Sequence, residues 1–230
     1  MHKRSILKVS IRITAAFLIL ISAAACKSTE TTTTQTSSSE KSDLESMYWA
    51  RVDSSRMALF TEADVDFMKG MIGHHAQALI MSKLAPENGA SAEIQVLASR
   101  IINAQKDEIA SMQQWLRDRN QAVPEVQIDG LILMIHGVGE HHSGHTNMPG
   151  MLTQEQLEEL ADTRGPEFDQ LFLKYMIEHH LGAVTMVKTL FGTDGAAQDE
   201  EAFRLASDIQ VDQITEIERM RLMLSRLSDS

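Results

Sequence analysis

Several residue types are scarce in this 230-residue chain, and each scarcity excludes a class of protein. Cys26 is the single cysteine, so neither an internal disulfide nor a thiolate metal cluster can form. Aromatic residues make up only 5% of the chain. The 21 basic residues are outnumbered by 32 acidic ones, which gives a formal net charge of −11. An acidic chain of this kind repels nucleic acid and attracts cations.

Sequence motifs that carry catalysis are missing as well. No Gly-rich phosphate loop, G-x-S-x-G elbow or H-E-x-x-H helix occurs in the chain. The single cysteine lies in the N-terminal segment described next, where it has no role as a nucleophile. We therefore expect that the protein is not an enzyme.

The N-terminal segment has the pattern of an export signal. A basic start precedes the apolar run 13–25, and Cys26 follows three alanines. The pattern resembles a bacterial lipoprotein signal, in which Cys26 is lipidated after cleavage. Ala23 stands where such signals more often carry Leu, so cleavage by an ordinary signal peptidase is the alternative. The run is short for a retained transmembrane helix.

These features predict three segments. Residues 1–25 are a lipoprotein-type signal peptide, residues 26–43 a flexible tether rich in Ser and Thr, and residues 44–230 the folded domain. Loss of the signal removes four basic residues and leaves a net charge of −15. We expect localisation in the cell envelope, with a lipid anchor in a bacterial membrane and the domain facing the periplasm or the exterior.

The folded region contains two matching segments, 64–81 and 169–186, at a constant offset of 105 residues. Each has apolar residues at helical spacing, which predicts a helix. A second pair of helices, 92–119 and 202–227, matches at an offset of 108. Nine of eighteen positions in the first pair of segments are identical: Asp64/Asp169, Phe67/Phe172, Lys69/Lys174, Met71/Met176, Ile72/Ile177, His74/His179, His75/His180, Ala78/Ala183 and Met81/Met186.

These matches predict a repeated helical hairpin, with repeat one at 64–120 and repeat two at 166–228. Each hairpin has an apolar stripe that must be buried, so we expect an all-α fold in which the two hairpins pack into a four-helix bundle. The segment 123–165 between them is a linker rich in His and Met. Within it, Thr153 and Gln156 have the spacing of a capping box at the start of a short helix.

Three stretches together resemble a known family. They are the MIxHHxxA core of both repeats, the linker sequence MPGMLTQEQLEEL, and RGPEFDQLFLKYMIEHHLGAVTM. They are similar to the bacterial domain of unknown function numbered 305, over roughly residues 64–224. The resemblance implies a secreted or periplasmic protein with a ferritin-like helical bundle. Some proteins similar to this family bind copper through Met and His, so metal binding is implied more readily than catalysis.

The residue types themselves favour copper. Ferritin-like di-iron sites need Glu-x-x-His pairs, but Met71 and Met176 stand three residues before His74 and His179. Thioether sulfur is a soft ligand that suits Cu(I), and imidazole suits copper and zinc, so copper as Cu(I) or Cu(II) is favoured over zinc. The predicted metal ligands are Met71, His74 or His75, and Met81 in repeat one, and Met176, His179 or His180, and Met186 in repeat two. Either each repeat holds one ion or the two double-histidine helices share one. Glu108 and Glu216, with Gln105 and Gln213, are expected to orient the imidazoles.

A second candidate site lies in the linker, where imidazoles and thioethers cluster. Its residues are His141, His142, His145, Met148 and Met151. Such a run binds copper or zinc as a flexible hook, or is simply a solvated loop.

The sequence thus predicts an extracytoplasmic copper-binding protein for sequestration, delivery or tolerance. The alternative is a structural or interaction module of the cell envelope without a specific metal site, in which the methionines fill the core. The expected partners are a metal ion and, through the lipid anchor, a membrane, but not nucleic acid. The sequence does not identify a protein partner.

Overall fold

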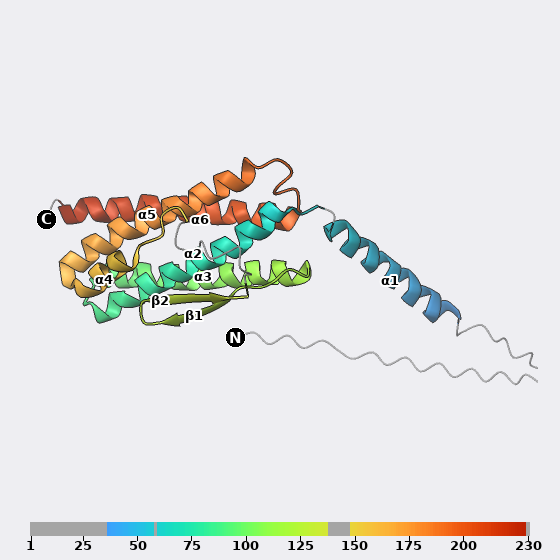
Figure 1. The fold of residues 1–230 in the computed structure, drawn as a ribbon, viewed down its shortest axis with the longest axis horizontal. Helices are drawn as coiled ribbons and strands as arrows, with labels where there is room; N and C mark the ends of the chain where they lie inside the picture. Colours follow the sequence, from blue (N-terminus) through green and yellow to red (C-terminus); the bar gives the residue numbers. More distant parts are fainter. Residues whose placement is uncertain (1–35, 58, 138–147, 229–230) are drawn as a thin grey trace, which may run out of the picture. The chain divides into compact units, whose positions relative to one another are not determined.

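The computed structural model describes residues 36–57, 59–137 and 148–228. The chain divides into two compact units, residues 1–45 and 46–230, and the fold below is that of the second. The predicted signal peptide, Cys26 and the rest of the predicted tether up to residue 35 lie outside the described residues, whereas residues 36–43 of that tether are helical. The elements are α1 (Thr36–Met57), α2 (Glu62–Glu87), α3 (Ala92–Asp118), β1 (Glu125–Asp129), β2 (Ile132–His136), α4 (Gln154–Asp162), α5 (Gly165–Phe191) and α6 (Glu200–Ser228) (Figure 1).

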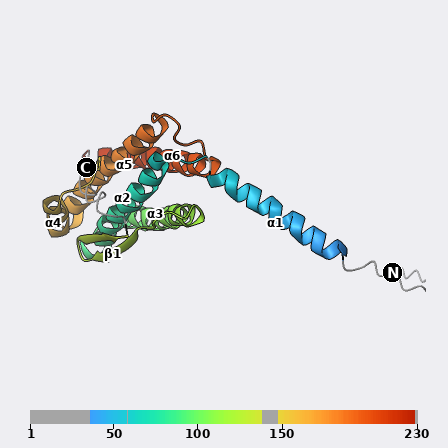
Figure 2. The ribbon, with the colours of Figure 1, turned by 45° about the vertical axis from the view of Figure 1, so that its right-hand side comes forward.

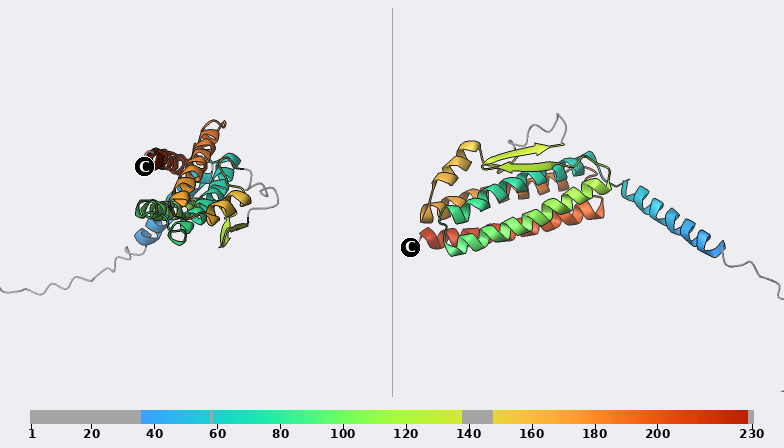
Figure 3. Two further views of the ribbon diagram at one scale, coloured as in Figure 1. Left: turned by 90° about the vertical axis from the view of Figure 1, so that its left-hand side faces the viewer. Right: turned by 90° about the horizontal axis from the view of Figure 1, so that it is seen from below.

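Four long helices dominate the second unit. α2 packs along α3 and α5 packs along α6, while α2 also contacts α5 and α3 contacts α6 (Figures 1 and 3). α2 and α5 run in opposite directions, as do α3 and α6 (Figure 1). The protein is therefore mostly helical, as the sequence predicts. None of the helices in the described ranges is both long and apolar enough to cross a bilayer.

α2 is the most buried helix of the unit. Its buried residues occupy nearly every position from Asp64 to Ser82, because α3, α5, α4 and the sheet all contact it. A helix that is apolar on all sides is stable only when it is covered in this way. The double-histidine segment of α2 therefore lies inside the protein.

Two aspartates connect the hairpin formed by α2 and α3 with the hairpin formed by α5 and α6. Asp64 caps α2 by accepting a hydrogen bond from the backbone of Thr61, and its other oxygen accepts one from Ala197 N at 2.7 Å. Asp169 likewise accepts from the backbone N–H of Ser91, which begins α3. Each aspartate thus satisfies a backbone donor in the other hairpin's loop. These contacts account for the aspartate at the first position of both matching segments.

A two-stranded sheet corrects the expectation of an all-α fold. β1 and β2 pair antiparallel, with Asp129 opposite Ile132, and pack against α2 (Figure 2). The turn between them has Gly130 at φ +57°, a backbone conformation that glycine adopts without strain. The loop consists of Gly130 and Leu131, and glycine at the first position of a two-residue loop between strands is a hairpin signal. The linker prediction overlooked it because the apolar run 131–135 is too short to show its period clearly.

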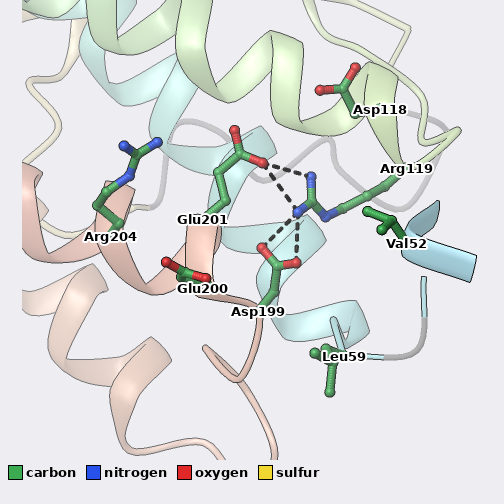
Figure 4. Close-up of a pocket in the computed structure, with 8 residues that line it drawn as sticks. All are labelled: Val52, Leu59, Asp118, Arg119, Asp199, Glu200, Glu201 and Arg204. Atoms are coloured by element: carbon green, nitrogen blue, oxygen red, sulfur yellow. Dashed lines mark hydrogen bonds and ion pairs between the residues drawn. The ribbon is translucent and has the colours of Figure 1, made fainter. Parts of the chain in front are cut away.

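A buried ion pair connects the end of α3 to the start of α6. Arg119 donates two hydrogen bonds to Asp199, at 2.6 and 2.7 Å, and also reaches Glu201 (Figure 4). Its guanidinium lies 4.3 Å from the ring centroid of Trp115, whose Nε1–H donates to Asp199 as well. The basic group belongs to a structural ion pair and is not available to bind an anion.

The linker ends in α4, which packs on the long helices α2 and α5. The predicted capping box is confirmed: Thr153 Oγ1 accepts from Gln156 N, and the Gln156 side chain accepts from Thr153 N. α4 then contacts α2 and α5. Its buried residues are Leu157 and Leu160, so this short helix closes one end of the apolar core.

Replacing Thr153 with Ala should lower the free energy of unfolding by about 1 kcal/mol, because one backbone N–H at the start of α4 loses its acceptor. Chemical denaturation measures the change. Thr185→Ala is the matched control, since the Thr185 hydroxyl only bonds back to Leu181 O on an exposed face of α5. Equal losses for the two variants would show that the capping box contributes nothing specific.

Candidate metal centre

Four histidines meet where α2 crosses α5. His74, His75, His179 and His180 have no exposed surface. The rings of His74 and His179 lie against each other, with centroids 3.9 Å apart and planes tilted by 39°. Within each pair of adjacent histidines the ring centroids lie 6.2–6.4 Å apart. The two double-histidine motifs, 105 residues apart in sequence, thus form one cluster.

Three of the four imidazoles are held by a hydrogen bond at Nε2. His75 contacts Glu108 Oε2 and His180 contacts Glu216 Oε2, both at 2.6 Å. Both carboxylates come from the second helix of the same hairpin, α3 or α6. His74 contacts the backbone oxygen of Pro149 at 3.0 Å. Carboxylate and carbonyl oxygens only accept, so Nε2 carries a proton in each of these rings.

The remaining ring nitrogens have no hydrogen-bond partner among the described residues. They are Nδ1 of His74, His75 and His180, and both nitrogens of His179. A neutral ring that is protonated at Nε2 has its lone pair at Nδ1. Buried polar atoms are almost always paired, and an unpaired one costs about 1–3 kcal/mol. A cluster of unpaired imidazole nitrogens is therefore the arrangement expected of a site for an electron-pair acceptor such as a metal ion.

Electrostatics keep the two central rings neutral. Burial, and then the neighbouring His75, lower the pKa of His74 to about 3, although its bond to Pro149 opposes the fall. Burial also lowers the pKa of His179 well below its ordinary value, and His74, His180 and His75 act in the same direction. Both rings can therefore offer a lone pair at neutral pH, because protons do not compete for it.

The linker covers this cluster by direct backbone contact. Gly150 and Gly182 allow the approach: a Cβ on Gly182 would lie 1.9 Å from Pro149 O, and one on Gly150 would lie 2.5 Å from Glu178 O. Gln77 fixes the next turn, since its side chain both donates to and accepts from the backbone of Leu152. The double-histidine pattern did not predict the Pro149 carbonyl as a partner for His74. The signal was the paired small residues, Gly150 in the linker and Gly182 beside the histidines.

The predicted methionine ligands fall on both sides of the histidines. Met71 and Met186 belong to one apolar cluster, and Met81 and Met176 to the other. Because α2 and α5 are antiparallel, each cluster combines non-equivalent positions from the two segments. Three of these side chains are completely buried and Met186 is partly buried.

The linker residues separate into two groups. Met148 lies close to Met186, since a Cβ on Gly70 would have Met148 Sδ at 3.3 Å and Met186 Cε at 3.4 Å. Met151 instead lines a cavity next to β2 and α4. His141, His142 and His145 lie outside the described residues. Of the linker candidates, therefore, Met148 is the one whose thioether the structure places beside α2 and α5.

Across residues 36–57, 59–137 and 148–228, no three His, Cys, Asp or Glu side chains are placed to hold a common ion. The histidine cluster thus offers at most two nitrogens to one ion as the side chains stand. Thioether sulfur is the other donor that this part of the core contains. The donor set of imidazole and thioether fits a soft or borderline metal better than a hard one.

Known proteins show the same fold. A DUF305 fragment from Deinococcus radiodurans is 28% identical, with a TM-score of 0.59 over 73% of this chain and 98% of that one. A predicted secreted DUF305 protein from Streptomyces coelicolor is 26% identical, with a TM-score of 0.60 over 72% and 92%. CopM in its Cu(II)-bound form is also 26% identical, with a TM-score of 0.52 over 71% and 96%. CopM is also known in a Cu(I)-bound form.

No curated protein matches the chain. The match that defines its family runs over residues 64–224, which include all four long helices of the second unit almost completely. This range confirms the resemblance expected from the double-histidine motifs and the linker sequence. The chain belongs to the family described as Domain of unknown function (DUF305).

Proposed function

We propose that this protein binds copper outside the cytoplasm, for sequestration, delivery or tolerance. The observation that carries the proposal is the set of unpartnered ring nitrogens at the crossing of α2 and α5. Three rings are oriented through Nε2 by a carboxylate or a carbonyl, which is how proteins commonly fix metal-binding histidines. The proposal includes no catalytic step.

The proposed ligands are His74 and His179, with methionines from the two adjacent clusters. Thioethers stabilise Cu(I), and imidazoles accept either oxidation state. His75 and His180 remain candidates through Nδ1, with Glu108 and Glu216 setting their orientation. Bound copper would supply the pairing that the buried nitrogens lack.

Two similarities support this proposal. CopM, a protein of similar fold, is known with Cu(I) and with Cu(II) bound. A related Streptomyces protein is a predicted secreted one, in agreement with the export signal expected at residues 1–25. We further propose that the signal is of the lipoprotein type with a lipid on Cys26. We also propose that the four long helices form a ferritin-like bundle built from a repeated hairpin.

The test is a titration of residues 44–230 with Cu(I) against a chromophoric chelator, without oxygen and with Zn(II) in parallel. The double variant His74→Leu/His179→Leu should lose at least 100-fold in copper affinity, because Leu has nearly the volume of His but no nitrogen. Circular dichroism checks that the helices persist.

His136→Leu is the control, since His136 is exposed at the end of β2 and away from the cluster. It should bind copper as the parent does. If the parent protein fails to compete with the chelator while remaining folded, the histidine cluster is a packing feature. The alternative of a structural or interaction module would then replace the proposal.

A further inference from the structure

A second polar site lies between α3 and α6, which run side by side (Figure 3). The cleft has a volume of about 210 Å³. Its lining includes three carboxylates: Glu108 from α3, and Asp212 and Glu216 from α6. Arg100 also contributes to the lining, so the cleft retains an excess of negative charge. The volume would hold roughly seven water molecules at the density of the liquid.

Two buried amides line the same cleft. Gln105 and Gln213 are 1% and 2% exposed. Neither the oxygen nor the nitrogen of the Gln105 amide has a hydrogen-bond partner among the described residues, and the Gln213 oxygen has none either. Two buried amides left unpaired in this way are costly, so a bound polar species is expected to satisfy them. Gln105 and Gln213 are also equivalent positions of the two hairpins, as are Glu108 and Glu216.

The carboxylates repel one another across the cleft. Burial raises the pKa of Asp212, and Glu108, Glu216 and Asp208 raise it further. Glu108 and Glu216 each use Oε2 to bind a histidine, which leaves Oε1 for another partner. A cation in the cleft would relieve this repulsion and accept the free oxygen lone pairs.

We propose that the α3–α6 cleft binds a hydrated hard divalent cation, Mg²⁺ or Ca²⁺, through Glu108, Asp212, Glu216 and the oxygens of Gln105 and Gln213. Every donor in this set is oxygen, which hard cations prefer and Cu(I) does not. The carboxylates do not converge closely enough to form a direct ligand set. The ion therefore keeps part of its water shell, and these waters also accept from the Gln105 amide.

This site is chemically distinct from the copper centre but touches it. Glu108 and Glu216 bind His75 and His180 on one side and face the cleft on the other. A cation in the cleft would hold the two carboxylates, and therefore the two imidazoles, in place. It would also join α3 to α6.

The test measures thermal unfolding of residues 44–230 with MgCl₂ or CaCl₂ at a constant ionic strength set with NaCl. At ten times the dissociation constant the midpoint should rise by about 3–6 °C. Asp212→Asn should abolish most of this rise. It removes a cleft carboxylate that, unlike Glu108 and Glu216, is not bonded to a histidine.

Asp107→Asn is the matched control, because Asp107 is an exposed acid on α3 outside the cleft lining. It should respond to the cations as the parent does, and so should His74→Leu/His179→Leu, which separates this site from the copper proposal. An equal rise in Asp212→Asn and the parent, or no rise in the parent, would overturn the proposal.

Discussion

Lowering the pH from 7 to 4 should destabilise the metal-free domain by about 3 kcal/mol through His74 alone. Burial lowers the pKa of this ring to about 3, whereas the unfolded chain has an ordinary histidine pKa of about 6.5. His179 adds a loss of the same sign, because its pKa is lowered as well.

Proton binding explains why the free energy of unfolding falls as the pH falls. Between pH 6.5 and 3 the unfolded chain binds a proton at His74 and the folded protein does not, so falling pH stabilises the unfolded state relative to the folded one. The stability contributed by the neutral ring is complete above pH 6.5. It is lost progressively down to about pH 3.

Urea denaturation of the metal-free protein at pH 7, 6, 5 and 4 measures this dependence. The slope should be at least 1.4 kcal/mol per pH unit between pH 6 and 4. His74→Leu/His179→Leu should lose most of it, while His136→Leu, altered at an exposed ring on β2, should keep it. An unchanged slope in the double variant would show that acidic groups elsewhere cause the loss of stability.

The helical part of the fold could be predicted because its signals are local or repeated. Apolar spacing located α2, α3, α5 and α6, and the Thr153 capping box located the start of α4. The matching segments also brought His74 and His179 into one prediction. Their rings, with centroids 3.9 Å apart, meet because α2 packs on α5, which the apolar stripes indicated only indirectly.

The remaining features of the histidine site depend on packing between residues far apart in the sequence. His74 binds the carbonyl of Pro149, 75 residues away, and in the sequence only the small residues Gly150 and Gly182 indicate this contact. The sequence also left two questions open that only the three-dimensional structure answers. One is which histidine of each pair faces the other hairpin, and the structure identifies His74 and His179. The other is how the methionines are shared, since α2 and α5 are antiparallel and each cluster takes residues from both.

Gly182→Ala should be one of the most damaging small substitutions in this protein. The added Cβ would lie 1.9 Å from Pro149 O and 2.4 Å from Pro149 C, where only backbone atoms are present. Backbone cannot rotate away as a side chain can, so the linker must move off α5. The His74 Nε2–Pro149 O bond of 3.0 Å would be lost with it.

We expect a loss of about 3 kcal/mol in the free energy of unfolding, net of the gain of up to ~1 kcal/mol that Ala brings to a helix. Urea denaturation measures it. Copper affinity should fall in the same variant, because His74 loses the acceptor that fixes its ring. A combined loss of stability and copper affinity would therefore show that the backbone contact between Pro149 and Gly182 holds the linker in place over the histidine cluster.

Gly70→Ala is the matched control, because it is the same change inside the neighbouring long helix α2. Its Cβ would meet only the flexible ends of Met148 and Met186, at 3.3 and 3.4 Å. These side chains can shift by a few tenths of an ångström, so the stability should stay within about 1 kcal/mol of the parent. If Gly182→Ala is as stable as Gly70→Ala and binds copper as tightly as the parent does, the linker does not depend on its contact with α5. The orientation of His74 must then depend on packing within the helices alone.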